Sequence, residues 1–349
     1  MQKKHVYYYD LIKVIAAFMV CFYHLGVLDV GTVQDAFYIP NFNKLTLNLC
    51  AMSVPLFFMV NGALMLRRTY SIKKLIFRTV KIIVLYLVWV VILGKIGKIF
   101  FGIEELTIME VAKGHRTTMS VHLWFLRTIA ILTMMVPFLK WIYDRPSKGM
   151  LYILLVLMFI FPFLYNYFVL GIKWLSISGS SNLSVTGIFT MYSVLYFILG
   201  KIISDKSTRE CETGKNHLGL AIIAIIVGWL LVGIEVTLWS NLNGAVYDGV
   251  NSSFPTIGAL LMAVGTFYIL SKLPNELNQK WLNILKIFAD NIMGVYIFHT
   301  VLVSVVLGVV EHTVSVFGAA FLTVLIMLIT TLITMGLKQI PLIKKLLTI

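Results

Sequence analysis

The chain is poor in charged residues and in cysteine, and it has no long polar segments. Asp, Glu, Lys and Arg make up 13% of its 349 residues, well below the roughly 25% of an ordinary soluble domain. The three cysteines, Cys21, Cys50 and Cys211, have neither the spacing of a disulfide framework nor that of a metal site, so we expect no metal. Without repeats or low-complexity tracts, residues 1–349 are expected to form a single integral-membrane domain with no appended soluble domain.

Hydrophobic residues make up 59% of the chain. Several runs exceed the ~18 apolar residues that indicate a membrane-spanning helix. The predicted fold class is therefore all-α, a polytopic transmembrane helical bundle of about ten spans. The predicted spans are 9–28, 45–66, 80–101, 121–141, 150–170, 185–203, 218–239, 254–271, 285–308 and 316–337.

The distribution of Lys and Arg predicts the orientation of the bundle. With both termini in the cytoplasm, 21 of these residues fall in inner segments and six in outer ones, as the positive-inside rule requires. The same asymmetry accounts for most of the net charge of +14 without a nucleic-acid partner. We expect a multi-pass protein of the plasma (inner) membrane whose N-terminus is cytoplasmic and whose partners include membrane lipids.

The first span carries a polar stripe. Eleven residues of helix make about three turns, so Lys13 and His24 lie on the same side, about 16 Å apart along the axis, and Asp10 lies close to Lys13 on the helical wheel. Lys3 and Lys4 followed by an apolar run resemble a signal peptide, but Asp10 and Lys13 interrupt that run and no cleavage site follows. Because ionisable side chains are expensive in lipid, this stripe must face protein or water.

A second polar region precedes the third span. Residues 67–81 contain six cations, and some of them recur at the i, i+4, i+7 positions of one helix face. Such a cluster is either an anchor on anionic lipid headgroups or a cradle for a phosphorylated cytosolic ligand. We refer to the six as the basic loop: Arg67, Arg68, Lys73, Lys74, Arg78 and Lys81.

Two further histidines lie toward the opposite face. His122 opens the fourth span at its outer end, and His299 lies in the outer half of the ninth span, at a depth similar to that of His24. A lone histidine in a helix is commonly structural, whereas polar groups inside spans are usually functional. Arg127 and Glu235 are also intramembrane, where each is a candidate to neutralise another buried charge.

Several sequence blocks follow one another in a characteristic order. The first is Lys13, ten further residues and His24. The blocks that follow are Pro55-Leu56-Phe57-Phe58-Met59-Val60-Asn61-Gly62, the basic run before span three, His122-Leu123-Trp124-Phe125-Leu126, Tyr196-Phe197-Ile198-Leu199-Gly200 and Gly294-Val295-Tyr296-Ile297-Phe298-His299. Together these blocks resemble the acyltransferase family 3 membrane proteins, whose first block is a basic residue, ten further residues and a histidine. The chain departs from the family in having Lys13 for the usual Arg and Asn61 for the usual Ser, and Lys lacks the planar fork of Arg.

The resemblance implies an enzyme that moves an acyl group, commonly acetyl, from cytosolic acyl-CoA to a hydroxyl of a cell-surface or lipid-linked glycan, such as a cell-envelope polysaccharide. Acyl-CoA is then the co-substrate, the basic loop binds its phosphates, and its pantetheine arm reaches His24. His24 is the expected general base, and Asp10 is expected to pair with Lys13. The candidates for stabilising the oxyanion are His299, His122, Trp124 and Asn61, and those for binding the acceptor are Trp124, Asn61 and Tyr296.

Two other classes compete with the enzyme. A carrier or flippase of lipid-linked sugars also has about ten spans, buried charges and prolines such as Pro137, Pro162 and Pro255. Against a carrier, the sequence has no corresponding halves of an inverted repeat, and the basic loop has no role in a carrier cycle. A membrane receptor is disfavoured because the outer loops are short.

Overall fold

The computed structural model describes residues 6–34, 37–112, 115–175, 191–213, 216–251, 254–273, 278–310 and 312–348. In these ranges the regular elements are all helices, which confirms the predicted all-α class. They are α1 (Tyr7–Leu25), α2 (Phe42–Asn48), η1 (Leu49–Met52), α3 (Ser53–Met65), α4 (Ile72–Phe101), α5 (Ile108–Ala112), η2 (Val121–Leu123), α6 (Trp124–Asp144), α7 (Gly149–Phe159), η3 (Ile160–Leu164), α8 (Tyr165–Trp174), α9 (Met191–Thr213), α10 (Leu218–Asn243), α11 (Ile257–Ser271), α12 (Gln279–Leu307), α13 (Val316–Leu337) and α14 (Pro341–Leu346).

Eight helical segments of the described chain are long and apolar enough to cross a membrane. They correspond to eight of the predicted spans, with α2, η1 and α3 forming one segment and α7, η3 and α8 another. The predicted span 254–271 is the shorter apolar helix α11, and the predicted span 185–203 overlaps α9, although residues 185–190 lie outside the described part. The protein is an integral membrane protein.

Some helices begin or end at residues other than the predicted span ends, because of capping side chains and glycine. Helix α4 begins at Ile72 rather than at residue 80, because the Ser71 side chain accepts a hydrogen bond from the Lys74 amide and caps the helix. Four of the six cations of the basic loop, Lys73, Lys74, Arg78 and Lys81, therefore lie on α4. Helix α1 ends where Gly26 adopts a φ of 62°, a left-handed conformation that glycine permits. Pro162, which has no amide hydrogen to donate, lies in the π-helical turn η3.

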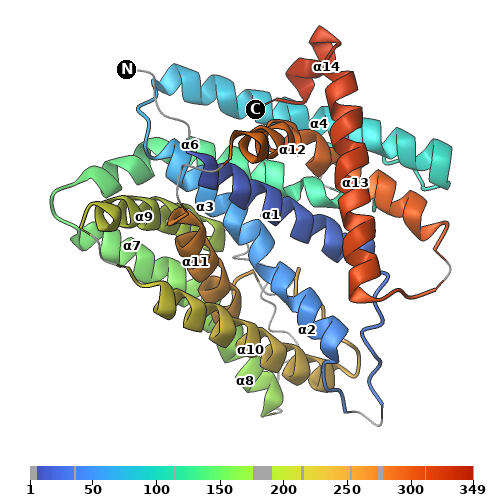
Figure 1. The fold of residues 1–349 in the computed structure, drawn as a ribbon, viewed down its shortest axis with the longest axis horizontal. Helices are drawn as coiled ribbons and strands as arrows, with labels where there is room; N and C mark the ends of the chain where they lie inside the picture. The colour runs from blue at the N-terminus through green and yellow to red at the C-terminus, as the bar shows by residue number, and fades with distance from the viewer. Residues whose placement is uncertain are drawn as a thin grey trace.

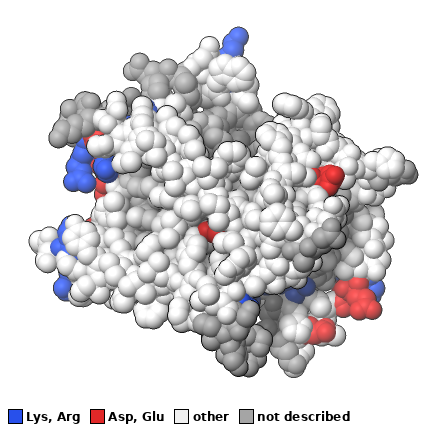
Figure 2. Space-filling model, turned by 90° about the horizontal axis from the view of Figure 1, so that it is seen from below, with Lys and Arg blue, Asp and Glu red and all other residues white. Residues whose placement is uncertain are grey.

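Helix α1 lies in the middle of the bundle, packed against α3, α11, α12 and α13 (Figure 1). Helices α1 and α4 begin at the left of that view, and we call this end of the bundle the basic end. The opposite end, where α1 finishes, is the histidine end. In the space-filling view the broad middle of the surface is almost free of charge, and Lys and Arg gather toward the basic end (Figure 2). A wide uncharged band of this kind suits contact with lipid.

Three glycines of the family-like blocks lie where helices approach most closely. A Cβ atom on Gly62 of α3 would collide with the Phe197 carbonyl of α9, and one on Gly200 of α9 would collide with the Met59 carbonyl of α3. In the same way Gly294 of α12 leaves no room beside Thr334 of α13. Small residues that let two backbones approach in this way are a common means of packing membrane helices.

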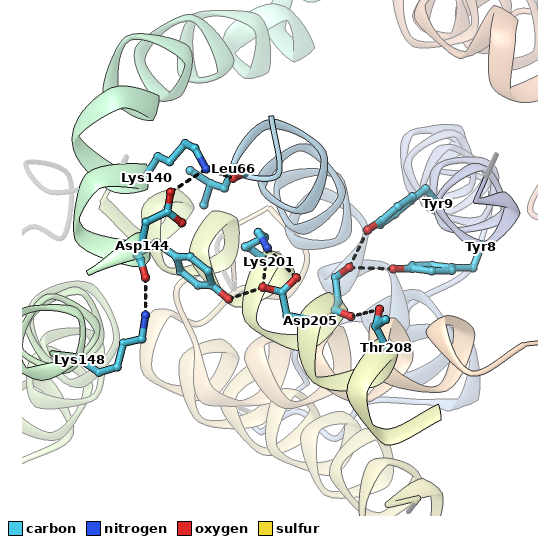
Figure 3. Close-up of polar contacts among 11 residues, drawn as sticks. Tyr8, Tyr9, Leu66, Lys140, Asp144, Lys148, Lys201, Asp205 and Thr208 are labelled. Carbon is cyan, nitrogen blue, oxygen red and sulfur yellow. Dashed lines mark hydrogen bonds and ion pairs between the residues drawn. The ribbon is translucent and has the colours of Figure 1, made fainter. Parts of the chain in front are cut away.

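A polar network joins three helices at the basic end (Figure 3). The hydroxyls of Tyr8 and Tyr9 on α1 lie 3.0 and 2.7 Å from that of Ser204 on α9. Asp205, also on α9, accepts a hydrogen bond of 2.7 Å from Tyr143 of α6 and pairs with Lys201. Because polar groups inside the bundle satisfy one another, the charged part of α9 can remain helical.

Replacing Gly200 with Ala is expected to destabilise the protein by about 1–3 kcal/mol, because the added methyl group overpacks the α3–α9 contact. Gly219→Ala on α10 is the matched control, since a Cβ there meets no atom within 4 Å. Thermal unfolding in detergent measures both. Equal melting temperatures for the two variants would contradict the close contact between α3 and α9.

Candidate functional site

Three histidines from separate parts of the chain meet at the histidine end. The ring centroid of His299 on α12 lies 5.2 Å from that of His24 on α1 and 4.8 Å from that of His122 in η2. His299 and His122 are buried, and His24 is half-buried. We call these three residues the histidine cluster. All three were expected from the sequence to lie toward this face, and the structure places them side by side.

Hydrogen bonding fixes the roles of the His299 ring atoms. Its Nδ1 lies 2.7 Å from the Tyr296 carbonyl and 3.2 Å from the Val295 carbonyl, so Nδ1 carries the hydrogen and donates it. In the neutral ring Nε2 is therefore an acceptor, and it is buried without a hydrogen-bond partner. Neutral His299 is thus suited to accept a proton or to orient a neighbouring ring, and it has no N–H for an oxyanion.

Neighbouring aromatic residues hold and extend the cluster. The Tyr296 hydroxyl donates to the His122 carbonyl at 2.5 Å and so joins α12 to the start of α6. Trp124, the first residue of α6, packs 6.0 Å from the ring of Phe254. In the described part of the chain its indole N–H has no hydrogen-bond partner, whereas those of Trp89 and Trp229 bond to carbonyls.

His24 lies between two cavities. The larger, of about 700 Å³, is lined by His24, His122, Trp124, Tyr296 and several other aromatic residues. The smaller, of about 410 Å³, lies against the same histidine and Tyr23. A ring that faces both spaces is placed to contact two ligands at once, which is the geometry a two-substrate transfer needs.

Two oppositely charged side chains line the smaller cavity: Asp248 from the loop that follows α10, and Lys44 of α2. Asp248 accepts hydrogen bonds from the Tyr23 hydroxyl at 2.5 Å and from the amides of Val250 and Asn251. Lys44 of α2, only 3% exposed, lines the same cavity. Asp248, His24 and Lys44 line this one cavity, so the carboxylate is placed to stabilise a positively charged His24.

The basic loop lies at the other end of the bundle. Arg67, Arg68, Lys73 and Lys74 are exposed, and Arg78 and Lys81 are half-buried. Lys140 of α6 donates to the Leu66 carbonyl at 3.1 Å and anchors the start of the loop. No carboxylate of the described residues forms an ion pair with any of the six cations. The described carboxylates therefore do not neutralise the positive charge of the basic loop, which is available to an anionic ligand or surface.

A family model described as an acyltransferase domain (Acyl_transf_3) matches residues 6–336, nearly the whole chain. The chain belongs to this acyltransferase family. It matches no curated protein and no solved structure. The resemblance drawn from the sequence blocks is thereby confirmed, and the protein is a membrane acyltransferase, which carries an acyl group from a donor co-substrate to an acceptor.

In this acyltransferase the polar stripe of α1 is not continuous, because apolar packing separates the Asp10–Lys13 pair from His24. Lys13 donates to Asp10 at 2.7 Å, which confirms the predicted pair. Between that pair and His24 the same face carries Ala17, which is 4% exposed and packs in a hydrophobic cluster with Val295 and Met327. Lys13 and His24 therefore act at opposite ends of the helix, and the pair stabilises the basic end of α1.

Other candidate residues of the acyltransferase have local partners. Asn61 donates to the Phe57 carbonyl at 2.8 Å and lines neither of the two cavities. Arg127 and Glu235 do not neutralise each other: Glu235 accepts a hydrogen bond from Tyr167, while Arg127 lies over the ring of Tyr86. Among the described residues no group of three or more His, Cys, Asp or Glu has the arrangement of a metal site.

Sequence reasoning did not assign a role to Tyr23, Lys44 or Asp248. Asp248 is the only acidic residue between α10 and α11, and it precedes a glycine in a turn, which is a weak signal of position alone. Tyr23 adjoins His24, but on a helix neighbouring residues point about 100° apart. Only the folding of the loop onto the end of α1 brings the carboxylate to the histidine.

Replacing Tyr296 with Phe is expected to lower the rate of acyl transfer several-fold, because the hydrogen bond that positions His122 is worth about 1 kcal/mol. The binding of the acyl donor should not change. Tyr152→Phe, at a side chain that is 63% exposed, serves as the control. Turnover of purified protein measures the effect, and an unchanged rate would show that the Tyr296 hydroxyl does not position the cluster.

Proposed function

We propose that this membrane acyltransferase moves an acyl group, acetyl in the simplest case, from acyl-CoA bound at the basic end to a hydroxyl of a cell-surface or lipid-linked glycan at the histidine end. In this proposal both termini and the basic end are cytoplasmic, in the plasma membrane. The observation that carries the proposal is the position of His24, which lines two cavities and contacts the ring of a second histidine.

His24 acts as the general base in the proposed step. Its neutral imidazole takes the proton of the acceptor hydroxyl while the hydroxyl oxygen forms a bond to the thioester carbonyl carbon. When the tetrahedral intermediate collapses, the carbon–sulfur bond breaks and the proton passes from His24 to the departing CoA thiolate. Asp248, which lines the smaller cavity with His24, stabilises the imidazolium that exists between these two transfers.

Trp124 and His122 are the proposed donors to the oxyanion. The indole N–H of Trp124 has no partner in the described part of the chain, and both ring nitrogens of His122 are buried without hydrogen bonds. Both residues line the larger cavity beside His24. One correctly placed donor is worth about 3–4 kcal/mol to such an intermediate. His299 is the less suitable donor, because its one N–H is held by backbone carbonyls.

The basic loop is the proposed site for the phosphates of CoA. Arginine forks and lysine ammonium groups suit phosphate oxygens, and the loop cations have no acidic partners of their own among the described residues. Besides His24, the larger cavity is lined by Val20 of the same helix, Phe57 of α3 and Ile131 of α6. We assign the pantetheine arm to this side of α1, because Ala17 and its neighbours close the face between Lys13 and His24.

Replacing His24 with Gln is expected to lower the rate of acyl transfer by about 10²–10⁴-fold, the usual contribution of a general base. Acetyl-CoA should still bind, because the loop that holds it is at the other end of the bundle. His312→Gln, at an exposed histidine, is the control. Full turnover by purified His24→Gln would refute the base.

Acetyl-CoA is expected to raise the melting temperature of the purified protein by mass action, and added salt should weaken the effect. Charge reversal at Arg67, Arg68 and Lys74 should remove the shift, whereas reversal at Lys280, an exposed cation outside the loop, should not. If millimolar CoA gives no shift while liposomes with the protein translocate lipid-linked sugars, the carrier is the better description.

A further inference from the structure

Two arginines lie together at the wall of the larger cavity. Arg116 precedes η2 and Arg127 is on the first turns of α6, and both line the space that His24 and His122 also face. The only hydrogen bond of Arg116 in the described structure goes to the Val121 carbonyl at 3.1 Å. Neither arginine has an ion-pair partner among the described residues, and the cavity lining contains no Asp or Glu. This wall therefore has two positive charges without a counter-charge.

The two guanidinium groups carry the same charge and line the same cavity. Burial lowers the pKa of Arg116 below its ordinary value, and the positive charge of Arg127 lowers it further. Tyr86 lies beside Arg127, whose guanidinium is 5.7 Å from the centre of its ring, and the buried Tyr86 hydroxyl has no hydrogen-bond partner among the described residues. An anion between these groups would relieve the repulsion and satisfy the free donors.

The same wall reaches the outer surface of the bundle. Arg127 is exposed, and so are Val121 and Ile131, at 44% and 50%, which line the cavity with it. These positions lie on the spanning segment Val121–Asp144, on a flank that lipid covers in a membrane. A ligand can therefore enter from the side, with an apolar portion left among the lipids and an anionic portion beside the arginines.

We propose that Arg116 and Arg127 bind the phosphate of a lipid-linked sugar, so that the acceptor is a glycan still attached to its lipid phosphate. The inference rests on the proposed function and names its substrate class. Arginine suits this role because its planar fork binds phosphate oxygens in pairs. The position of Arg127 also restricts which sugar is acylated. Arg127 is three residues after Trp124 on one helix face, so the sugar next to the phosphate is the one that reaches His24.

The test uses the full-length protein in nanodiscs of neutral lipid, with geranyl phosphate as the probe and geraniol as its uncharged counterpart. Binding is followed by the shift in melting temperature over a titration. Geranyl phosphate is expected to stabilise the wild type and geraniol to have little effect. Arg127→Gln and Arg116→Gln should each raise the Kd about tenfold or more, a factor equal to ~1.4 kcal/mol. Lys95→Gln, an exposed cation that contacts Glu105, should leave the Kd unchanged.

A variant that preserves the charge distinguishes a specific loss of binding from misfolding. Arg127→Lys keeps the positive charge and loses the fork, and it should bind geranyl phosphate more weakly than the wild type and more tightly than Arg127→Gln. Acetyl-CoA is titrated in the same samples and should stabilise every one of these variants as it does the wild type. This second titration separates the acceptor site from the donor site, because the basic loop is intact in all of them.

Three results would overturn the inference. The first is that geranyl phosphate does not stabilise the wild type although acetyl-CoA does, which leaves the proposed function standing without this site. The second is that phosphatidylglycerol in the nanodisc abolishes the geranyl phosphate effect, which makes the arginines a site for bulk anionic lipid. The third is that Arg127→Gln loses the acetyl-CoA shift, which assigns the arginines to the phosphates of the donor.

Discussion

The packing of α1 in the middle of the bundle is the constraint on which the rest of the structure depends. A polar side chain inside a membrane needs a partner within the protein, and α1 carries polar residues at both of its ends. Because α3, α11, α12 and α13 surround it, Asp10 and Lys13 satisfy each other at the basic end. At the other end His24 meets the ring of His299 and two cavities. One buried helix thus connects a positively charged end to the histidine cluster.

The two ends differ in how their charges are arranged. At the basic end, Lys201 and Asp205 form part of a closed network with Tyr143. The cations of the basic loop are exposed or half-buried, and they have no ion-pair partner among the described residues. At the histidine end, both ring nitrogens of His122, which lines the larger cavity, and Nε2 of the buried His299 have no hydrogen-bond partner among the described residues. Polar groups left without partners in a folded protein commonly belong to binding or catalytic sites. The distribution therefore indicates one ligand site near each membrane surface.

Sequence periodicity predicted the helical class, most of the spans and the depth of His24 and His299, since these follow from local composition. It also predicted the Asp10–Lys13 pair, because residues three apart meet on any helix. Sequence periodicity does not predict how the loops fold or which helices they contact. The approach of Asp248 to His24, the closure of the stripe by Ala17 and the meeting of Arg116 with Arg127 depend on which helices become neighbours. The spacing of Lys74, Arg78 and Lys81 predicted a helix that enters the third span, whereas its first residue, Ile72, depends on the cap at Ser71.

If a donor held at the basic end acylates an acceptor at the histidine end, the acyl group passes from one side of the membrane to the other. Proteoliposomes that enclose ¹³C-acetyl-CoA, with cell-envelope glycan added only outside, test this transfer. Mass spectrometry of the external glycan should then find ¹³C-acetyl groups that depend on His24. If the external glycan stays unlabelled while glycan enclosed together with the acetyl-CoA becomes labelled, donor and acceptor meet on the same side and the account is contradicted.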